Sequence, residues 1–146
     1  MVPFVLLLVS LLAFRSLGAA GVEPLSDWRN AAACSLALMF LFTASAHFTS
    51  TKKDLIAMVP SVFPRPELMV IVTGILEILG AIGLLIPATR SFAGIGLILL
   101  LVALFPANVA AARKQVPLRG KPPTPLPFRL FLQLAFIGTT WWATQT

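Results

Sequence analysis

The chain has 146 residues, enough for one domain, and its composition is far more apolar than that of a water-soluble protein. Hydrophobic residues make up 58% of it and charged residues only 11%, whereas soluble domains carry about a quarter charged residues. So few charges exclude a water-soluble globule, and so many apolar side chains exclude intrinsic disorder.

The net charge of +6, the single cysteine and the single histidine limit the partners and metal sites that the protein can have. The basic residues gather in two short loops between apolar runs, which is typical of membrane topology, so we predict no nucleic-acid partner. Cys34 alone excludes an internal disulfide, a CxxC redox pair and a thiolate zinc site. His47 alone argues against a histidine-rich metal site, and we predict no metal ligands.

Five apolar stretches approach the roughly 20 residues that a helix needs to cross a bilayer. We therefore predict an all-α integral membrane bundle, with residues 1–146 as a single transmembrane domain. The first stretch lacks the basic start of a signal peptide, so we expect it to span, although a cleaved or re-entrant segment is the alternative. The predicted helices are residues 2–21, 30–48, 68–86, 92–112 and 127–143.

Loop charges predict the orientation of these helices in the membrane. Three basic residues lie in the segment 49–67 and five in the segment 113–129, and alternating helices bring both segments to one side. The other side receives only Arg29 and Arg90. We expect the protein in a plasma or inner membrane, with the N-terminus and the basic loops cytoplasmic and the C-terminus outside.

Polar side chains inside the predicted helices are the candidates for function, because they are costly in lipid. Thr43 and His47 lie four residues apart and share one helix face, and Thr73, Glu77 and Gly80 follow the same spacing on the next helix. Two such stripes predict one polar cavity, near whose cytoplasmic mouth Asn108 also lies.

Each polar residue has a structural interpretation beside the functional one. Glu77 either pairs with Arg15, handles a proton or ligand, or faces lipid at a kink. His47 either ends its helix with a hydrogen bond or acts as an acid or base, and for Asn108 a bond between helices is favoured. Arg15 either pairs with Glu77 or extends outward to the interface.

Several short segments, in order and spacing, resemble the DoxX family over residues 28–142. The segments are FTASAHF at 42–48, MVP at 58–60, FPRPE at 63–67, TGILEILG at 73–80, GLLIP at 83–87 and FPAN at 105–108. The resemblance implies a small four-helix membrane core, with the first predicted helix outside it, and His47, Glu77 and Asn108 as the family's polar signature. The family is named after a membrane subunit of a thiosulfate:quinone oxidoreductase, and its relatives are linked to redox-enzyme maturation and oxidative-stress complexes.

Three functions follow as hypotheses. The first is a subunit of a membrane redox system in which His47, Glu77 and Asn108 form the catalytic site, and Thr43, Thr73 and Gly80 line a site for a quinone or other lipid-like ligand. Electrons would come from a partner protein, because the chain has no haem, flavin or iron–sulfur motif. The second is a non-catalytic scaffold or assembly factor, and the third is a lipid-modifying or isomerising enzyme. In each case we expect a homo-oligomer or a complex with a redox partner.

Overall fold

The structure, a computed structural model, describes residues 2–122 and 124–145, and within them it has six α-helices and no β-strand. The expected all-helical class is confirmed. The helices are α1 (Val2–Ala19), α2 (Trp28–Ser45), α3 (Lys52–Met58), α4 (Pro66–Leu85), α5 (Arg90–Arg113) and α6 (Leu126–Thr144), with a 3-10 turn, η1 (Glu23–Leu25), between α1 and α2.

Each of the five predicted stretches contains one long helix, with ends that differ by up to three residues. Local capping explains the earlier start of α2, because the Asp27 carboxylate accepts hydrogen bonds from the backbone N–H groups of Arg29 and Asn30. The prediction of an unbroken loop over residues 49–67 is wrong. Lys52–Met58 forms the short helix α3, which packs against α4 and α5.

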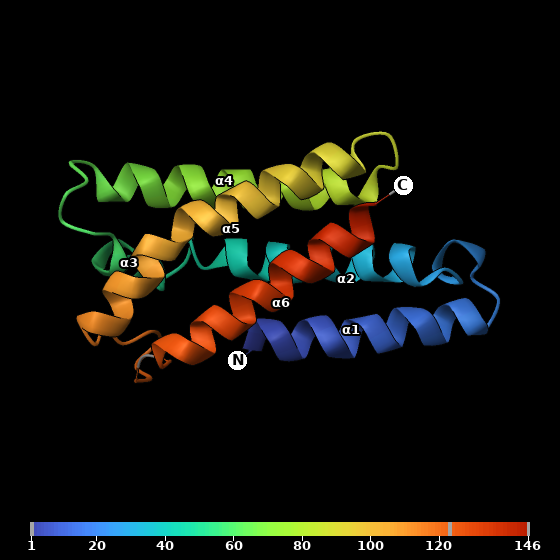
Figure 1. The fold of residues 1–146 in the computed structure, drawn as a ribbon, viewed down its shortest axis with the longest axis horizontal. Coiled ribbons are helices and arrows are strands. Elements are labelled where there is room, and N and C mark those ends of the chain that lie inside the picture. The colour runs from blue at the N-terminus through green and yellow to red at the C-terminus, as the bar shows by residue number, and fades with distance from the viewer. Residues whose placement is uncertain (1, 123, 146) are drawn as a thin grey trace.

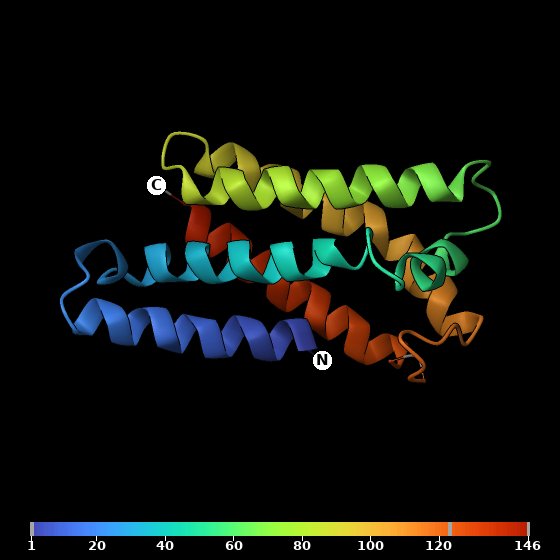
Figure 2. The ribbon, with the colours of Figure 1, turned by 180° about the vertical axis from the view of Figure 1, so that it is seen from behind.

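Helix α2 occupies the centre of the bundle. It contacts α1, α4 and α6, while α4 pairs with α5 and α5 with α6 (Figures 1 and 2). Its buried residues, which include the alanine run 31–33, cover all of the helix surface except the face of Leu38 and Leu41. Small side chains let membrane helices approach closely, which explains how three neighbours fit around one helix.

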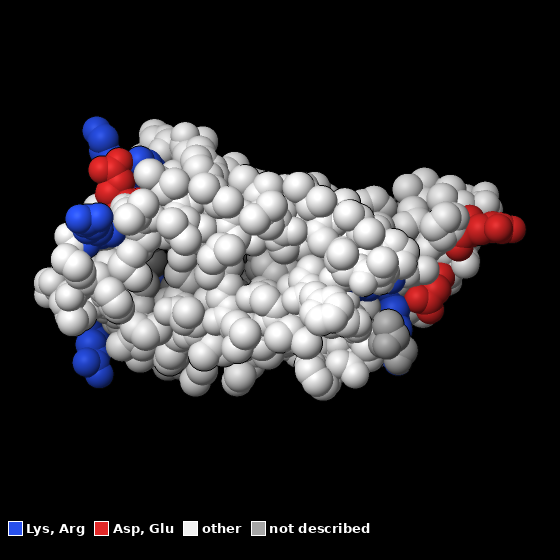
Figure 3. Space-filling model, turned by 90° about the horizontal axis from the view of Figure 1, so that it is seen from above, with Lys and Arg blue, Asp and Glu red and all other residues white. Residues whose placement is uncertain are grey.

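The bundle has two different ends. The loops between α2 and α4 and between α5 and α6 lie at one end, and the loops that follow α1 and α4 lie at the other, together with the C-terminus (Figure 1). Lysine, arginine and acidic side chains gather at these two ends, and the face between them in Figure 3 carries none.

Three helices are long and apolar enough to cross a membrane: Val2–Ala19, Pro66–Leu85 and Arg90–Arg113. Their outward side chains are mainly leucine, isoleucine and valine, including Leu79 and Leu99, which are 59% and 64% exposed. Such an apolar surface is typical of a membrane protein.

Gly18 tests the packing of α1 against the turn that follows it. A Cβ at this position would overlap the backbone carbonyl of Leu25, which cannot swing aside as a side chain can. We expect Gly18→Val to lower the free energy of unfolding by about 1–3 kcal/mol. Gly96→Ala is the control, because a Cβ there meets no atom within 4 Å. Thermal unfolding in detergent measures both, and equal midpoints for the two variants would contradict the packing.

Candidate functional site

Glu77 lies halfway along α4 and turns inward, toward α2. The residue is only 6% exposed, and its Oε2 atom lies 2.7 Å from the hydroxyl of Thr43 on α2. A buried carboxyl is costly unless a polar partner satisfies it, and Thr43 is such a partner. The alternative in which Glu77 faces lipid is therefore wrong.

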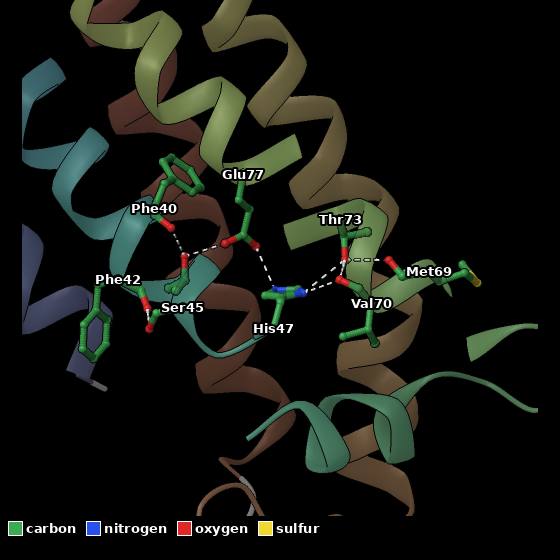
Figure 4. Close-up of polar contacts among 9 residues, drawn as sticks. Phe40, Phe42, Ser45, His47, Met69, Val70, Thr73 and Glu77 are labelled. Carbon is green, nitrogen blue, oxygen red and sulfur yellow. Dashed lines mark hydrogen bonds and ion pairs between the residues drawn. The ribbon is translucent and has the colours of Figure 1, made fainter. Parts of the chain in front are cut away.

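His47 lies beside Glu77 because α2 ends just before it. The helix stops at Ser45, and the chain turns so that the imidazole, 7% exposed as a residue, points between α2 and α4. Its Nδ1 atom lies 2.6 Å from the Val70 carbonyl oxygen, and its Nε2 atom lies 3.6 Å from Glu77 Oε1 (Figure 4). The two ring nitrogens thus face two different oxygens.

These contacts determine where protons can sit. A carbonyl oxygen only accepts, so Nδ1 must carry a hydrogen toward Val70. Nε2 then has a lone pair in the neutral ring, and that lone pair would repel an ionised carboxylate at Oε1. The contact is attractive when the pair holds one further proton, either on Nε2 as imidazolium or on Glu77 as carboxylic acid. A proton added to the pair can therefore lie on either of these two side chains.

Thr43 can accommodate both positions of that proton. Its hydroxyl lies 2.7 Å from Glu77 Oε2 and 3.0 Å from the Phe40 carbonyl oxygen, and it has a single hydrogen to donate. In both states Oε2 is an acceptor, either as part of the carboxylate or as the carbonyl oxygen of an acid protonated on Oε1, so the Thr43 hydroxyl donates to it throughout.

Thr73 and Gly74 complete the surroundings of His47. The Thr73 hydroxyl donates to the carbonyls of Met69 or Val70, and its oxygen lies 3.4 Å from His47 Nδ1. A Cβ on Gly74 would lie within 2.8 Å of the His47 side chain, so glycine is needed for this close approach. Sequence reasoning missed the roles of Gly74 and Val70, although Gly74 stands directly after Thr73 in the TGILE segment.

A cavity of about 750 Å³ opens beside this group. It has the size of a typical small-molecule site. Among the residues proposed from the sequence, those that line it are Thr43, His47, Thr73, Glu77 and Asn108. Most of the other lining side chains are apolar, and they come from α2 to α6, from the loops at this end, and from Val2 and Pro3 at the start of α1.

Gly80 does not belong to this lining. A Cβ on Gly80 would lie 2.5 Å from a methyl group of Leu97, so this glycine receives α5 rather than a ligand. Gly80 lies on the same stripe as Thr73 and Glu77, but it is about two turns beyond Thr73, where α5 packs against this face of α4. The sequence-based assignment of Gly80 to a ligand site is therefore replaced by a packing role.

Asn108 lies in the same cavity but bonds to a different helix. Its Oδ1 atom accepts a hydrogen bond of 3.0 Å from Arg129 on α6. The expected bond between helices is confirmed. The asparagine therefore positions a basic side chain at the cavity wall.

Arg15 does not pair with Glu77. Its guanidinium donates to the carbonyls of Leu25 and Ser26 at 3.0 and 2.7 Å and stacks over the Trp28 ring at 4.7 Å. The expected partner was wrong because α1 packs against α2 and η1, so its arginine reaches the loop after α1. Of the two interpretations, extension toward the end of the bundle is the one observed.

Comparison with known protein families matches residues 36–144 to DUF8561, a domain of unknown function. The chain belongs to this family. No curated protein and no solved structure matches the chain. The match begins within α2 and ends with α6, so it covers the cavity residues from α2 to α6 and leaves α1 and Arg15 outside.

Thr43 provides a test of the carboxyl's partners. Thr43→Val keeps the side-chain shape and removes the hydroxyl, so Glu77 Oε2 loses its partner, and we expect a loss of about 1–3 kcal/mol in the free energy of unfolding. Thr139→Val is the matched control, because its hydroxyl bonds to Ala135 within its own helix. Unfolding in a denaturing detergent measures both. A loss no larger for Thr43→Val than for Thr139→Val would contradict the assigned bond.

Proposed function

We propose that the protein crosses a membrane with its five long helices, α1, α2, α4, α5 and α6. The apolar surfaces of α1, α4 and α5 support this, as does the separation of charge to the two ends of the bundle. Helices α2 and α6 are less apolar, but α2 packs against α1, α4 and α6, and its open face carries the apolar side chains of Leu38 and Leu41. The basic loops favour a cytoplasmic N-terminus and an outer C-terminus in a plasma or inner membrane.

Site-directed labelling tests this topology. In a Cys34→Ala background, Lys53→Cys and Lys114→Cys place thiols in the two basic segments, and Asp27→Cys places one at the opposite end. We expect an impermeant maleimide applied outside intact cells to label only Asp27→Cys, and to label the others after the membrane is opened. Labelling of all three from outside would contradict the proposed crossing.

We further propose that the bundle is of the DoxX type, with α2, α4, α5 and α6 as its core and α1 as an addition. The sequence segments that resemble that family include His47, Glu77 and Asn108, and all three line one cavity. The DUF8561 match, which leaves α1 outside, is compatible with such a division.

The function we propose is that of a subunit of a membrane redox system that binds a quinone or a similar lipid-like molecule in this cavity. The observation that carries the proposal is a buried His47–Glu77 contact of 3.6 Å at the wall of a mainly apolar cavity. In this proposal the pair holds one exchangeable proton. Quinone reduction takes up two electrons and two protons. A partner protein supplies the electrons, the pair supplies one proton, and the second arrives through the open end of the cavity.

The same geometry favours a second candidate, a lipid-isomerising enzyme. A pair that stores one proton can remove a proton from one carbon of a lipid and return it to another, with no change in mass. The two candidates differ in whether electrons are needed, so incubation of the purified protein with extracted lipids distinguishes them.

Glu77→Gln and His47→Asn test the redox proposal, because each removes the exchangeable proton and retains a polar side chain. In membranes that contain the protein and its native partners, we expect each variant to reduce decylubiquinone about 10²–10⁴-fold more slowly, the usual contribution of a positioned acid or base. Ser35→Ala is the control, because Ser35 is equally buried, bonds only within α2 and does not line the cavity. Unchanged reduction in both variants would reject the proposed role.

A further inference from the structure

The cavity opens at the basic end of the bundle. This opening, named here the outer end of the cavity, is positively charged. Arg119, Lys121 and Arg129 line it, and Glu77 is the sole acidic side chain among the described lining residues. Because His47 already faces Glu77, that carboxyl does not neutralise the three cations. The ion pairs found among residues 2–122 and 124–145 are His47–Glu77 and Lys52–Glu67, and neither includes them.

Arg129 is the best positioned of the three cations. It is half-buried, and two hydrogen bonds hold it, from Nη1 to Asn108 Oδ1 at 3.0 Å and from Nε to the Thr124 carbonyl at 2.9 Å. A guanidinium has five N–H groups, so three remain for a ligand. Both partners are neutral, and the positive charge of Arg129 stays uncompensated in the described structure.

Arg119 is similarly placed without an acidic partner for its side chain. Its guanidinium donates to the Thr51 hydroxyl at 3.2 Å and lies over the Phe42 ring at 5.7 Å. Asp54 accepts the backbone N–H of Arg119, not the guanidinium. Two arginines and a lysine therefore line one opening with their charges available.

Apart from Thr43, His47 and Glu77, the inner end of the cavity is apolar. Leu101 on α5 and Phe136 on α6 each lie seven residues, or about 10 Å along the helix, inward from Asn108 and Arg129. Met39 and Phe40 on α2 line the cavity as well. The cavity thus changes from cationic at its outer end to apolar at its inner end.

We propose that this outer end is a binding site for the anionic head group of a single-chain amphiphile, whose chain extends inward toward Phe136. A carboxylate or phosphate matches the planar N–H groups of Arg129, and the apolar inner end accepts the chain. The inference rests on the proposed function only in that the same cavity admits a lipid-like molecule. It is independent of the proton stored by His47 and Glu77.

A positive charge at the cytoplasmic end of the bundle is also expected from membrane topology, but topology does not require the charged side chains to line a cavity. Arg113 and Lys114 provide positive charge at the same end of the bundle and do not belong to the lining. Arg129, by contrast, is drawn to the cavity wall by Asn108. The difference between these two groups of basic residues is the basis of the test.

The test measures binding of radiolabelled oleate and of oleyl alcohol, which has the same chain and no charge, to the full chain in phosphatidylcholine nanodiscs. We expect Arg129→Gln and Lys121→Gln each to weaken oleate binding by about tenfold, and to change oleyl alcohol binding by less than about twofold. Arg113→Gln and Lys114→Gln, which remove the same charge outside the cavity, should leave oleate binding unchanged. Arg129→Lys, which keeps the positive charge, should bind oleate more tightly than Arg129→Gln does. Such a difference would show that the loss in Arg129→Gln comes from the missing charge and not from misfolding.

Three outcomes would overturn the proposal. The first is that the unmodified protein binds oleate and oleyl alcohol with equal affinity. The second is that Lys114→Gln weakens oleate binding as much as Arg129→Gln does. The third is that inorganic phosphate displaces oleate completely and binds as tightly as oleate does, which would indicate a site for free anions. Lysophosphatidate, with a phosphate head, should bind as well as oleate. Oleate binding is measured without electrons or a partner protein, so failure of the quinone proposal is distinguishable from failure of this one.

Discussion

The contact on which the site depends is the one between Glu77 and its two partners across the α2–α4 interface. A carboxyl in the middle of an apolar helix destabilises the fold unless another helix supplies polar atoms at the right height. Thr43 and His47 do so from successive turns at the end of α2. Gly74 then permits the imidazole to lie directly against α4. The spacing of the two helices, the orientation of His47 and the shape of the cavity wall all follow from this arrangement.

Polar contacts of another kind join the helices at the opposite end of the bundle. Arg90 donates to the Leu84 carbonyl and to Asn30, Arg29 donates to the Gln145 carbonyl, and Arg15 donates to the loop after α1. Each of these arginines bonds to neutral oxygens and closes the bundle between neighbouring elements. The basic end is built differently, since its arginines and lysine surround an opening.

The cavity combines two polar zones with different chemistry. In the inner zone, Glu77 lies 2.7 Å from the Thr43 hydroxyl and 3.6 Å from the His47 imidazole. The outer zone, of Arg119, Lys121 and Arg129, carries positive charge that no described acidic side chain neutralises. A neutral ring such as a quinone suits the first zone, and an anionic head group suits the second. An amphiphile held at the outer zone would place its chain past the inner one.

The sequence by itself determined the helical class, the number of long helices and the residues worth examining, because apolar length and isolated polar side chains are local properties of the chain. It also predicted that Thr43 and His47 share a helix face, but α2 ends at Ser45 and His47 reaches Glu77 from the turn that follows. Only the tertiary structure decided the partners. Arg15 and Glu77 are separated because α1 packs beside η1, and Gly80 is turned toward Leu97 because α4 is covered by α5 on that side. Asn108 is joined to Arg129 by the packing of α5 on α6. Pairing depends on the rotation of each helix about its axis, and that rotation is determined by the packing of whole helices against one another.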